Sequence, residues 1–464
     1  MTDGRRIHLI GIGGTGLSAI ARVLHARGWQ VSGCDRSPSP TLDALRARGI
    51  PAVVGHDPAH VARADVVLRS SAVPEQHPEV QAARAAGVPV LTRRAFLPTL
   101  TAGYRTLAVA GTHGKTTTTA MLAWALAALG EDPTLIVGGE VPDWGNARVG
   151  RGPWFVIEAD EYDHMFLGLQ PEVGVITTLE HDHPDLFPTW DAYLDAFAAF
   201  AARVTDALVL RADDPGVAAL RARRPAMPRA VTFALQGPAD YRVTDLTPQP
   251  GRGYAFALQR PAGPPVEVRL RVPGRHNAAN AAAALAVLDH LGLDTPAAAE
   301  ALADFPGAGR RFTIVAQRDG VAWVDDYAHH PTEIAATLAA AREQFPGRTV
   351  WAVWQPHTYS RTRTLWDGFV RALQAADAVL VLPVYAAREQ PLPGVDAAAL
   401  ARAVAQAASE SRGPRFVAHA ADLDHAAEIL AERVQAPAVV VFLSAGDAPR
   451  VLDRLGLTPT EVPS

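Results

Sequence analysis

Short apolar runs alternate along the chain with longer stretches of Ala, Leu and Arg at helical spacing. Aliphatic or aromatic runs of this length, bounded by glycine or polar residues, are typical of buried strands in a parallel sheet. Such runs occupy residues 7–10, 106–110, 154–157, 173–177, 321–324, 350–354, 378–382 and 438–443. Because strands and helices alternate, the pattern predicts an α/β protein.

We expect three α/β domains, with boundaries at residues 1–102, 103–311 and 312–464. The length of 464 residues exceeds what one hydrophobic core usually covers. Near the end of the second unit, residues 254–258 and 266–270 are separated by a Pro-Gly turn and predict a hairpin. Residues 309–312, with the sequence GRRF, are predicted to form the hinge to the third unit.

The second unit opens with a phosphate-binding pattern at residues 110–117, AGTHGKTT, between a strand and a helix. The backbone N–H groups of such a turn and the helix dipole attract phosphate oxygens. Lys115 would add a charge for the β- and γ-phosphates, and the Thr116 hydroxyl could ligate Mg²⁺. Val109 stands where the general pattern has its first glycine, so the loop is shortened.

Lys115 is the only lysine in the chain, since every other basic side chain is Arg or His. Lys carries a compact charge on a thin stem, whereas Arg presents a wide planar fork. A narrow loop around a triphosphate accepts the first and excludes the second. The position of the only lysine within this motif therefore favours a phosphate-binding loop over a chance glycine turn.

The first strand leads into a second glycine turn, GIGGTG at residues 11–16, and an acidic residue, Asp35, follows about 20 positions later. This is the dinucleotide-binding pattern, in which a diphosphate lies at a helix N-terminus. The ligand could be a nicotinamide cofactor or a UDP-sugar, and the alternative is a purely structural βα turn. Ser70 and Ser71 follow a later strand and are expected at the same ligand-binding edge.

Acidic and imidazole groups follow two strands of the second unit, in EADEYD at residues 158–163 and EHDHPD at residues 180–185. Carboxylates downstream of a phosphate loop suit a divalent cation that bridges phosphate oxygens. His-x-His also occurs in zinc sites, but the many hard carboxylates and the absence of a nearby cysteine favour Mg²⁺. The remaining alternative is a solvated acidic loop.

Two further groups of residues are candidates for ligand binding. Asn277 and Asn280 lie at the start of an Ala-rich helix, where Asn is ordinarily a cap but could instead contact an adenine edge. In the third unit, polar residues follow the strands at residues 325–331 and 355–363. Repeated polar clusters at strand ends indicate the edge of a binding site.

Composition excludes several classes of protein. A net charge of −5 argues against a nucleic-acid binder, and no apolar run is long enough to cross a membrane. The N-terminus lacks the pattern of a signal peptide, and the single cysteine, Cys34, excludes an intrachain disulfide framework. We expect a soluble cytoplasmic protein in which Cys34 is an inert buried thiol.

Taken in order, these pieces resemble the Mur ligases of peptidoglycan synthesis. The matching segments are GIGGTG, GTHGKTTT, EADE, DHPD, GRHNAAN, GRRF, DDYAHHPTE and QPHTYSRT, which together span nearly the whole chain. Each is weak alone, whereas the ordered set is specific. The shortened phosphate loop is this family's own form.

The resemblance implies a Rossmann-like N-terminal domain for a UDP-sugar, a central P-loop ATPase-type α/β domain, and a Rossmann-like C-terminal domain for an amino acid. It is closest to the members that join L-alanine to UDP-N-acetylmuramate. The implied reaction is ATP-dependent ligation through an acyl phosphate, with Mg²⁺ or alternatively Mn²⁺. The implied protein is a cytoplasmic monomer or weak homodimer without a nucleic-acid or membrane partner.

The resemblance also implies roles for individual residues. ATP would contact Gly111, Thr112, His113, Gly114, Lys115, Thr116, Thr117, Asn277, Asn280, Arg311 and Asp326. The UDP-sugar would contact Gly11, Gly13, Gly14, Thr15, Gly16, Asp35, Ser70 and Ser71. The amino acid would contact Tyr327, His329, His357 and Arg361, with Arg361 as carboxylate clamp. The metal ligands would be Thr116, Glu158 and His183, and the catalytic set Lys115, Glu158, His183 and His329, with His329 as the candidate base.

The chain departs from the family pattern at two positions. Thr178 stands where many relatives have Asn, and Thr358 where many have Arg, which leaves Arg361 with less cationic help. The carbamylated lysine that some related ligases use is excluded, because Lys115 is the only lysine. Other readings are a recycling ligase that adds a preformed tripeptide, a nicotinamide-dependent oxidoreductase and a non-catalytic nucleotide-binding regulator.

Overall fold

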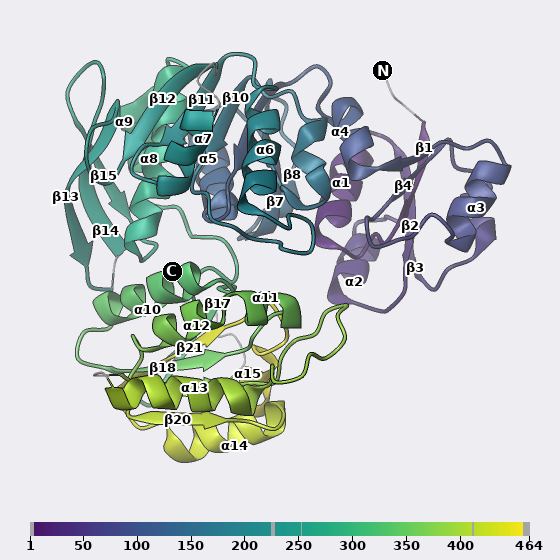
Figure 1. The fold of residues 1–464 in the computed structure, drawn as a ribbon. Helices are drawn as coiled ribbons and strands as arrows, with labels where there is room; N and C mark the ends of the chain where they lie inside the picture. Colours follow the sequence, from purple (N-terminus) through teal and green to yellow (C-terminus); the bar gives the residue numbers. More distant parts are fainter. Residues whose placement is uncertain (1–3, 224–227, 252, 411–412, 458–464) are drawn as a thin grey trace.

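The computed structural model describes residues 4–223, 228–251, 253–410 and 413–457, and it contains three sheets, one in each predicted unit (Figure 1). The predicted α/β fold with three domains is confirmed. The boundaries predicted at residues 102/103 and 311/312 stay predictions. Every strand predicted from the apolar runs is present, within one or two residues of its expected ends.

The N-terminal sheet has five parallel strands in the order β3-β2-β1-β4-β5. Its strands are β1 Arg6–Ile10, β2 Gln30–Asp35, β3 Ala52–Val54, β4 Val66–Arg69 and β5 Val90–Thr92. Its helices are α1 Thr15–Ala26, α2 Pro40–Ala47, the short 3-10 helix η1 Pro58–Val61, α3 Pro78–Ala85 and α4 Arg93–Thr101. This strand order places the glycine turn after β1 at the centre of the sheet edge.

The central sheet has ten strands in the order β15-β14-β13-β12-β11-β10-β6-β9-β7-β8. Its strands are β6 Arg105–Ala110, β7 Thr134–Val141, β8 Gly145–Arg148, β9 Trp154–Glu158, β10 Val173–Ile176, β11 Ala207–Arg211, β12 Arg229–Ala234, β13 Tyr241–Gln249, β14 Gly253–Gln259 and β15 Val266–Leu270. Its helices are α5 Lys115–Ala128, η2 Tyr162–Gly168, α6 Trp190–Ala201, α7 Pro215–Arg223, α8 Arg275–His290 and α9 Thr295–Leu302. The predicted hairpin is the antiparallel pair β14–β15 at one edge.

The C-terminal sheet has six strands in the order β16-β17-β21-β18-β19-β20, and only β16 runs antiparallel to its neighbour. Its strands are β16 Thr313–Arg318, β17 Val321–Asp326, β18 Thr349–Trp354, β19 Ala378–Val381, β20 Phe416–His419 and β21 Ala438–Leu443. Its helices are α10 Pro331–Gln344, α11 Tyr359–Thr364, α12 Trp366–Leu373, α13 Ala397–Glu410, α14 Leu423–Arg433 and α15 Arg450–Arg454.

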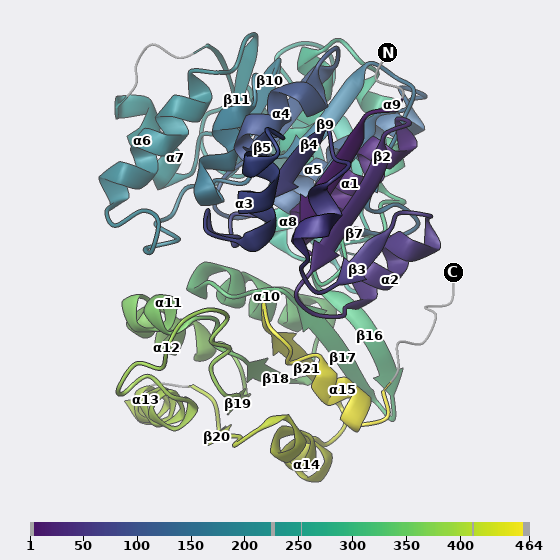
Figure 2. The same cartoon turned by 90° about the vertical axis from the view of Figure 1, so that its right-hand side faces the viewer.

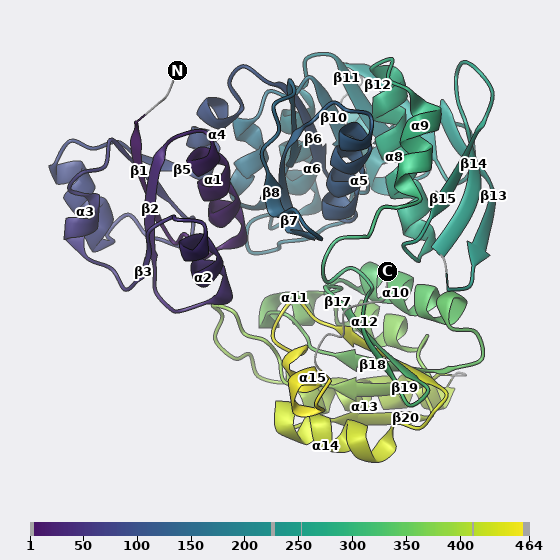
Figure 3. The same ribbon diagram turned by 180° about the vertical axis from the view of Figure 1, so that it is seen from behind.

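The two outer units both pack against the central one. Helix α1 lies against β7 and β8, where Arg22 donates to Asn146 Oδ1 at 2.9 Å and Asn146 donates to the Thr15 carbonyl at 2.9 Å. On the other side, α10 faces the central unit and contacts α8 and β13 (Figures 1 and 2). The view from behind shows the same arrangement (Figure 3). The carboxyl end of β6 therefore faces residues from the C-terminal unit.

None of the helices in the described ranges is long and apolar enough to span a membrane.

Candidate active site

An open cavity of about 130 Å³ lies where the phosphate loop, the start of α8 and the C-terminal unit meet. Several predicted nucleotide-binding residues line it: His113, Gly114, Thr116, Thr117, Asn277, Asn280, Arg311 and Asp326. Residues for which no binding role was predicted also line it, among them Thr177, Arg211, Phe233, His276, Phe312, Thr332 and Glu333. Two domains thus contribute walls to a single cavity.

The phosphate loop requires glycine at two positions. Gly111 has φ +133°, and a Cβ there would lie 2.2 Å from Thr177 Oγ1. Gly114, which precedes the first residue of α5, has φ +80°, and a Cβ there would lie 2.4 Å from Asn280 Oδ1. Left-handed backbone and close neighbours exclude larger residues at both positions. The turn after β6 is therefore a narrow cradle at the N-terminus of α5.

Lys115 lies inside this cradle and is held by oxygen atoms. Its Nζ donates to the Gly111 carbonyl at 2.5 Å and to the Thr112 carbonyl at 3.2 Å, and Glu161 Oε2 lies 3.0 Å away. Burial alone would lower the pKa of Lys115, but the carboxylates of Glu161 and Asp160 outweigh it and raise that pKa. The side chain is therefore a fixed cation at the position where phosphate oxygens would lie.

Two of the three predicted metal ligands lie in direct contact. The Thr116 hydroxyl donates to Glu158 Oε1 at 3.1 Å, and Glu158 Oε2 accepts from the Gly138 N–H at 2.6 Å. The third, His183, has its Nε2 3.6 Å from Glu161 and 3.6 Å from Asp182. Hydroxyl, carboxylate and imidazole groups beside the phosphate cradle are a donor set that fits a hard divalent cation.

His113 joins the phosphate loop to the C-terminal unit. Its Nε2 lies 3.2 Å from Glu180, and its Nδ1 lies 3.2 Å from Glu333 on α10. Burial opposes its charge, but the two carboxylates raise the pKa of His113 to about 9, so the ring is an imidazolium at neutral pH. Thr332, also on α10, donates to Glu180 at 2.7 Å. The start of α10 is therefore docked on the loop through charged contacts.

The two asparagines of α8 are buried rather than capping. The residue that precedes the helix is Gly274, without a side-chain cap, so the capping interpretation of Asn277 and Asn280 is wrong. Asn277 Nδ2 donates to the Pro273 carbonyl at 2.7 Å, and Asn280 Nδ2 donates to Asn277 Oδ1 at 3.0 Å. The pair forms a fixed polar edge of the cavity, which is consistent with contact to a base.

Arg311 and Asp326 reach the cavity from the hinge and from the end of β17. Asp326 accepts from the Phe312 N–H at 2.7 Å and from the Ala328 N–H at 2.8 Å. Burial raises the pKa of Asp326 to about 7, although Arg311 acts in the opposite direction. The Arg311 guanidinium lies over the Tyr327 ring, 5.3 Å from its centroid.

The predicted amino-acid residues cluster around a buried ion pair that the sequence did not reveal. Arg361 donates to Asp182 Oδ1 from Nε at 3.0 Å and from Nη2 at 2.9 Å, and its Nη1 lies 3.1 Å from His357 Nδ1. His329 Nδ1 donates to the Tyr327 carbonyl at 2.9 Å. Burial lowers the pKa of His329 to about 3, so the ring is neutral and only weakly basic. Arg361 thus keeps only part of its fork for a substrate carboxylate.

The glycine turn after β1 is closed by its own acidic residue. Asp35 Oδ2 accepts from the Gly13 N–H at 2.9 Å, and Gly11 has φ +86°. Ser70 Cβ lies only 3.0 Å from where a Gly11 Cβ would be, so the serine packs on the turn. Gly14 precedes the first residue of α1, and Thr15, Gly16 and Ser71 lie at the same edge. The structure therefore brings the predicted UDP-sugar residues together, with Asp35 holding the loop.

Comparison with known proteins assigns the family. Residues 6–105 match the Mur ligase family catalytic domain, residues 109–288 the Mur ligase middle domain, and residues 310–446 the Mur ligase glutamate ligase domain. The chain belongs to the Mur ligase family.

Several relatives of this Mur ligase resemble it over nearly their full length. It is 48% identical to the UDP-N-acetylmuramate–L-alanine ligase of Kineococcus radiotolerans over 97% of this chain and 96% of that protein. It is 43% identical to the protein of the same name from Thermobifida fusca, over 97% of each. The crystal structure of UDP-N-acetylmuramate-alanine ligase from Thermotoga maritima superposes with a TM-score of 0.79 and 30% identity, covering 97% of this chain and 99% of that one.

Some residues of this Mur ligase could have been found from its motifs, and others could not. Glu161, Glu180 and Glu333 lie inside or beside the quoted segments, so their acidic character was the available signal. Arg211 is the last residue of β11, and Phe233 lies in β12. Nothing in their local sequence distinguishes them from other strand residues. They line the cavity because the sheet order places β11 beside β10 and β12 beside β11.

Proposed function

We propose that this Mur ligase joins L-alanine to the lactyl carboxylate of UDP-N-acetylmuramate at the expense of ATP, in the cytoplasm during peptidoglycan precursor synthesis. The observation that carries the proposal is a half-buried lysine in a phosphate cradle whose cavity is completed by a second domain. Relatives that cover almost the whole chain, and carry that activity in their names, support the choice of substrates.

The reaction has two steps. A lactyl carboxylate oxygen attacks the γ-phosphorus of ATP and ADP leaves, which forms an acyl phosphate. The amine of L-alanine then attacks the acyl carbon, phosphate leaves with the C–O bond electrons, and the amine loses a proton. ATP is needed because a carboxylate oxygen by itself is a very poor leaving group.

The protein's contribution is positioning and charge compensation. Lys115 would turn from Glu161 to the β- and γ-phosphate oxygens, and the N–H groups at the start of α5 would hold the same phosphates. Thr116, Glu158 and His183 would hold Mg²⁺ or Mn²⁺, which when bound offsets the negative charge of the triphosphate. Asn277 and Asn280 would contact the adenine, and Arg311 and Asp326 the phosphate and ribose.

The amino acid would bind between the central and C-terminal units. Arg361 would take its carboxylate through the donors that Asp182 leaves available. His329 keeps Nε2 for the amine, because its Nδ1 already donates to a carbonyl. Since the ring is weakly basic, we assign it to orienting a neutral amine by accepting a hydrogen bond, with the released proton passed on to solvent or phosphate.

The deciding experiment measures phosphate release from ATP with UDP-N-acetylmuramate and Mg²⁺, with L-alanine, glycine, L-serine or the preformed tripeptide in separate reactions. Release that needs both the UDP-sugar and L-alanine supports the proposal. Release with the tripeptide alone would identify a recycling ligase instead. Absence of release with every amine, despite ATP binding, would overturn the enzymatic function. The predicted monomer or weak homodimer would be tested by sedimentation.

A further inference from the structure

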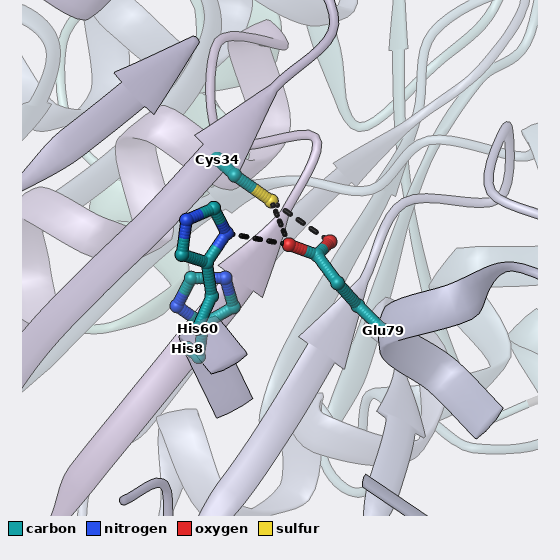
Figure 4. A group of neighbouring side chains, drawn as sticks. All are labelled: His8, Cys34, His60 and Glu79. Carbon is teal, nitrogen blue, oxygen red and sulfur yellow. Dashed lines mark hydrogen bonds and ion pairs between the residues drawn. The ribbon is translucent and has the colours of Figure 1, made fainter. Parts of the chain in front are cut away.

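A cluster of metal-ligand side chains lies in the N-terminal domain, away from the cavity described above. It contains His8, Cys34, His60 and Glu79, which offer one potential ligand atom each within 4.8 Å of one another (Figure 4). The cluster arises from strand alternation and two neighbouring helical segments. His8 on β1 and Cys34 on β2 point to the same face of the sheet, and η1 and α3 cover that face with His60 and Glu79.

The central member is a completely buried carboxylate. Glu79 is 0% exposed, and it accepts from the Cys34 thiol at 3.0 Å, while His60 Nδ1 lies 2.7 Å from its Oε1. His56 Nδ1 lies 3.1 Å from Glu79 Oε2 and 3.3 Å from the Cys34 sulfur. Burying the Glu79 carboxylate, the Cys34 thiol and the His8 imidazole together is costly unless hydrogen bonds or a cation compensate them.

His8 has a buried ring nitrogen that no hydrogen bond among the described residues satisfies. The side chain is 2% exposed, and its Nδ1 lies 3.0 Å from Ser32 Oγ. Its Nε2 has no hydrogen-bond partner within the described part of the chain. A buried imidazole with one nitrogen fixed by a hydroxyl and the other unpartnered is the arrangement of a metal-ligating histidine.

We propose that His8, Cys34, His60 and Glu79 form a Zn²⁺ site that fixes the glycine turn of the N-terminal domain. One thiolate, two imidazoles and one carboxylate are a tetrahedral zinc donor set. Ligand atoms around such an ion are about 3.3–3.8 Å apart, so side-chain movements of about 1 Å convert the cluster into a coordination shell. The ion displaces the thiol proton, which leaves to solvent through the partly exposed His56, whose Nδ1 lies 3.3 Å from the Cys34 sulfur.

The link to the glycine turn is a set of backbone contacts. The Cys34 carbonyl accepts from the N–H groups of Gly11 at 2.8 Å and Ile12 at 3.0 Å. The next residue, Asp35, accepts from Gly13. Cys34 and Asp35, at the end of β2, thus accept hydrogen bonds from three consecutive N–H groups of the turn. A metal ion that fixes the Cys34 side chain would therefore also fix the turn.

Cobalt substitution tests the site directly, because Cys34 is the only cysteine in the chain. Any sulfur-to-cobalt charge-transfer band must therefore come from Cys34, whereas cobalt bound among the active-site carboxylates and histidines gives none. We expect the full-length protein to bind Co²⁺ with this band and Zn²⁺ to abolish it by displacement. A folded protein that binds Co²⁺ without the band would overturn the proposal.

Variants separate metal binding from a hydrogen-bonded structural role. Cys34→Ser keeps a donor toward Glu79 but removes the thiolate, so it should fold, lose the band and bind Zn²⁺ more weakly by roughly 100-fold or more. His60→Gln is an independent removal of a ligand, and His25→Ala, exposed on α1, is the matched control. Equal Zn²⁺ affinity in wild type and Cys34→Ser would overturn the site.

Hydrogen exchange tests the anchoring of the turn. Zn²⁺ should slow exchange of the amides of Gly11, Ile12 and Gly13 in the wild type and in His25→Ala, but not in Cys34→Ser. Exchange of this segment that does not respond to Zn²⁺ in the wild type would overturn the anchoring role. Neither experiment depends on ligase activity, so their outcome is independent of the proposed reaction.

Discussion

The pairing of Lys115 with Glu161 gives a prediction that separates the stability of the loop from its chemistry. The two side chains are 14% and 1% exposed, and their charged atoms lie 3.0 Å apart. Lys115→Met leaves the Glu161 carboxylate buried without its cation, and breaking a buried pair in this way costs about 3–5 kcal/mol. Loss of a fixed cation at the phosphates should also lower kcat by about 10²–10³-fold, equivalent to about 2.7–4 kcal/mol.

Two further variants distinguish these effects. Lys115→Met combined with Glu161→Gln removes both charges, so the urea midpoint should return toward the wild-type value while phosphate release stays low. Lys115→Arg keeps the charge and should keep most of the stability, but its planar fork should not fit the loop, so activity should stay low. Equal destabilisation of the single and double variants would refute the pairing. Undiminished phosphate release by Lys115→Met would refute the role of the lysine.

Three other outcomes follow from the geometry. Gly114→Ala should lower the urea midpoint of the nucleotide-free protein, because a left-handed residue costs about 1–2 kcal/mol and its Cβ would meet Asn280. Adding Asn280→Ala should recover part of this loss, and no recovery would contradict the clash. The contact of His113 with its carboxylates should stabilise the fold fully below about pH 6.5, and this stabilisation should be lost as pH rises through about 9, whereas the contribution of Glu180, whose pKa is lowered to about 2, is lost as pH falls below about 4.5. His113→Asn should therefore flatten the dependence of the melting temperature on pH between 6.5 and 9, by the equivalent of at most about 3 kcal/mol. An unchanged pH profile would contradict the pairing. Chelation of divalent cations should stop phosphate release, and added Mn²⁺ should restore it. Glu158→Gln should lower kcat/KM by about 10²-fold or more at limiting Mg²⁺. Activity that survives chelation would contradict a metal requirement.

The parts of this fold that depend on local sequence were predictable. The strand at 106–110 is a continuous apolar run, and Gly111 and Gly114 mark a turn whose left-handed residues only glycine accepts readily. The hairpin β14–β15 followed from two alternating segments around a Pro-Gly turn. Each of these signals is contained within about fifteen residues, and no distant contact was needed to interpret it.

The contacts that complete the sites come from residues distant in sequence, and so were not predictable. His113 and Glu333 are 220 positions apart, and Asp182 and Arg361 are 179 apart. Motif spacing says which residues could carry chemistry, but only the docking of the C-terminal unit decides which of them pair. Cys34 shows the same limit: its burial was predicted correctly, whereas its polar surroundings depend on three other segments of the N-terminal domain.

The cations of the nucleotide cavity are already paired with carboxylates before any phosphate enters. Lys115 is held by Glu161, and His113 by Glu180 and Glu333. A triphosphate therefore exchanges partners with these groups, and its binding free energy is a difference between two sets of ion pairs. Because Glu333 belongs to the C-terminal unit, recruiting His113 to a phosphate would weaken the contact that docks α10 on the loop. We therefore expect nucleotide binding and the position of the C-terminal unit to be coupled through the His113 imidazolium.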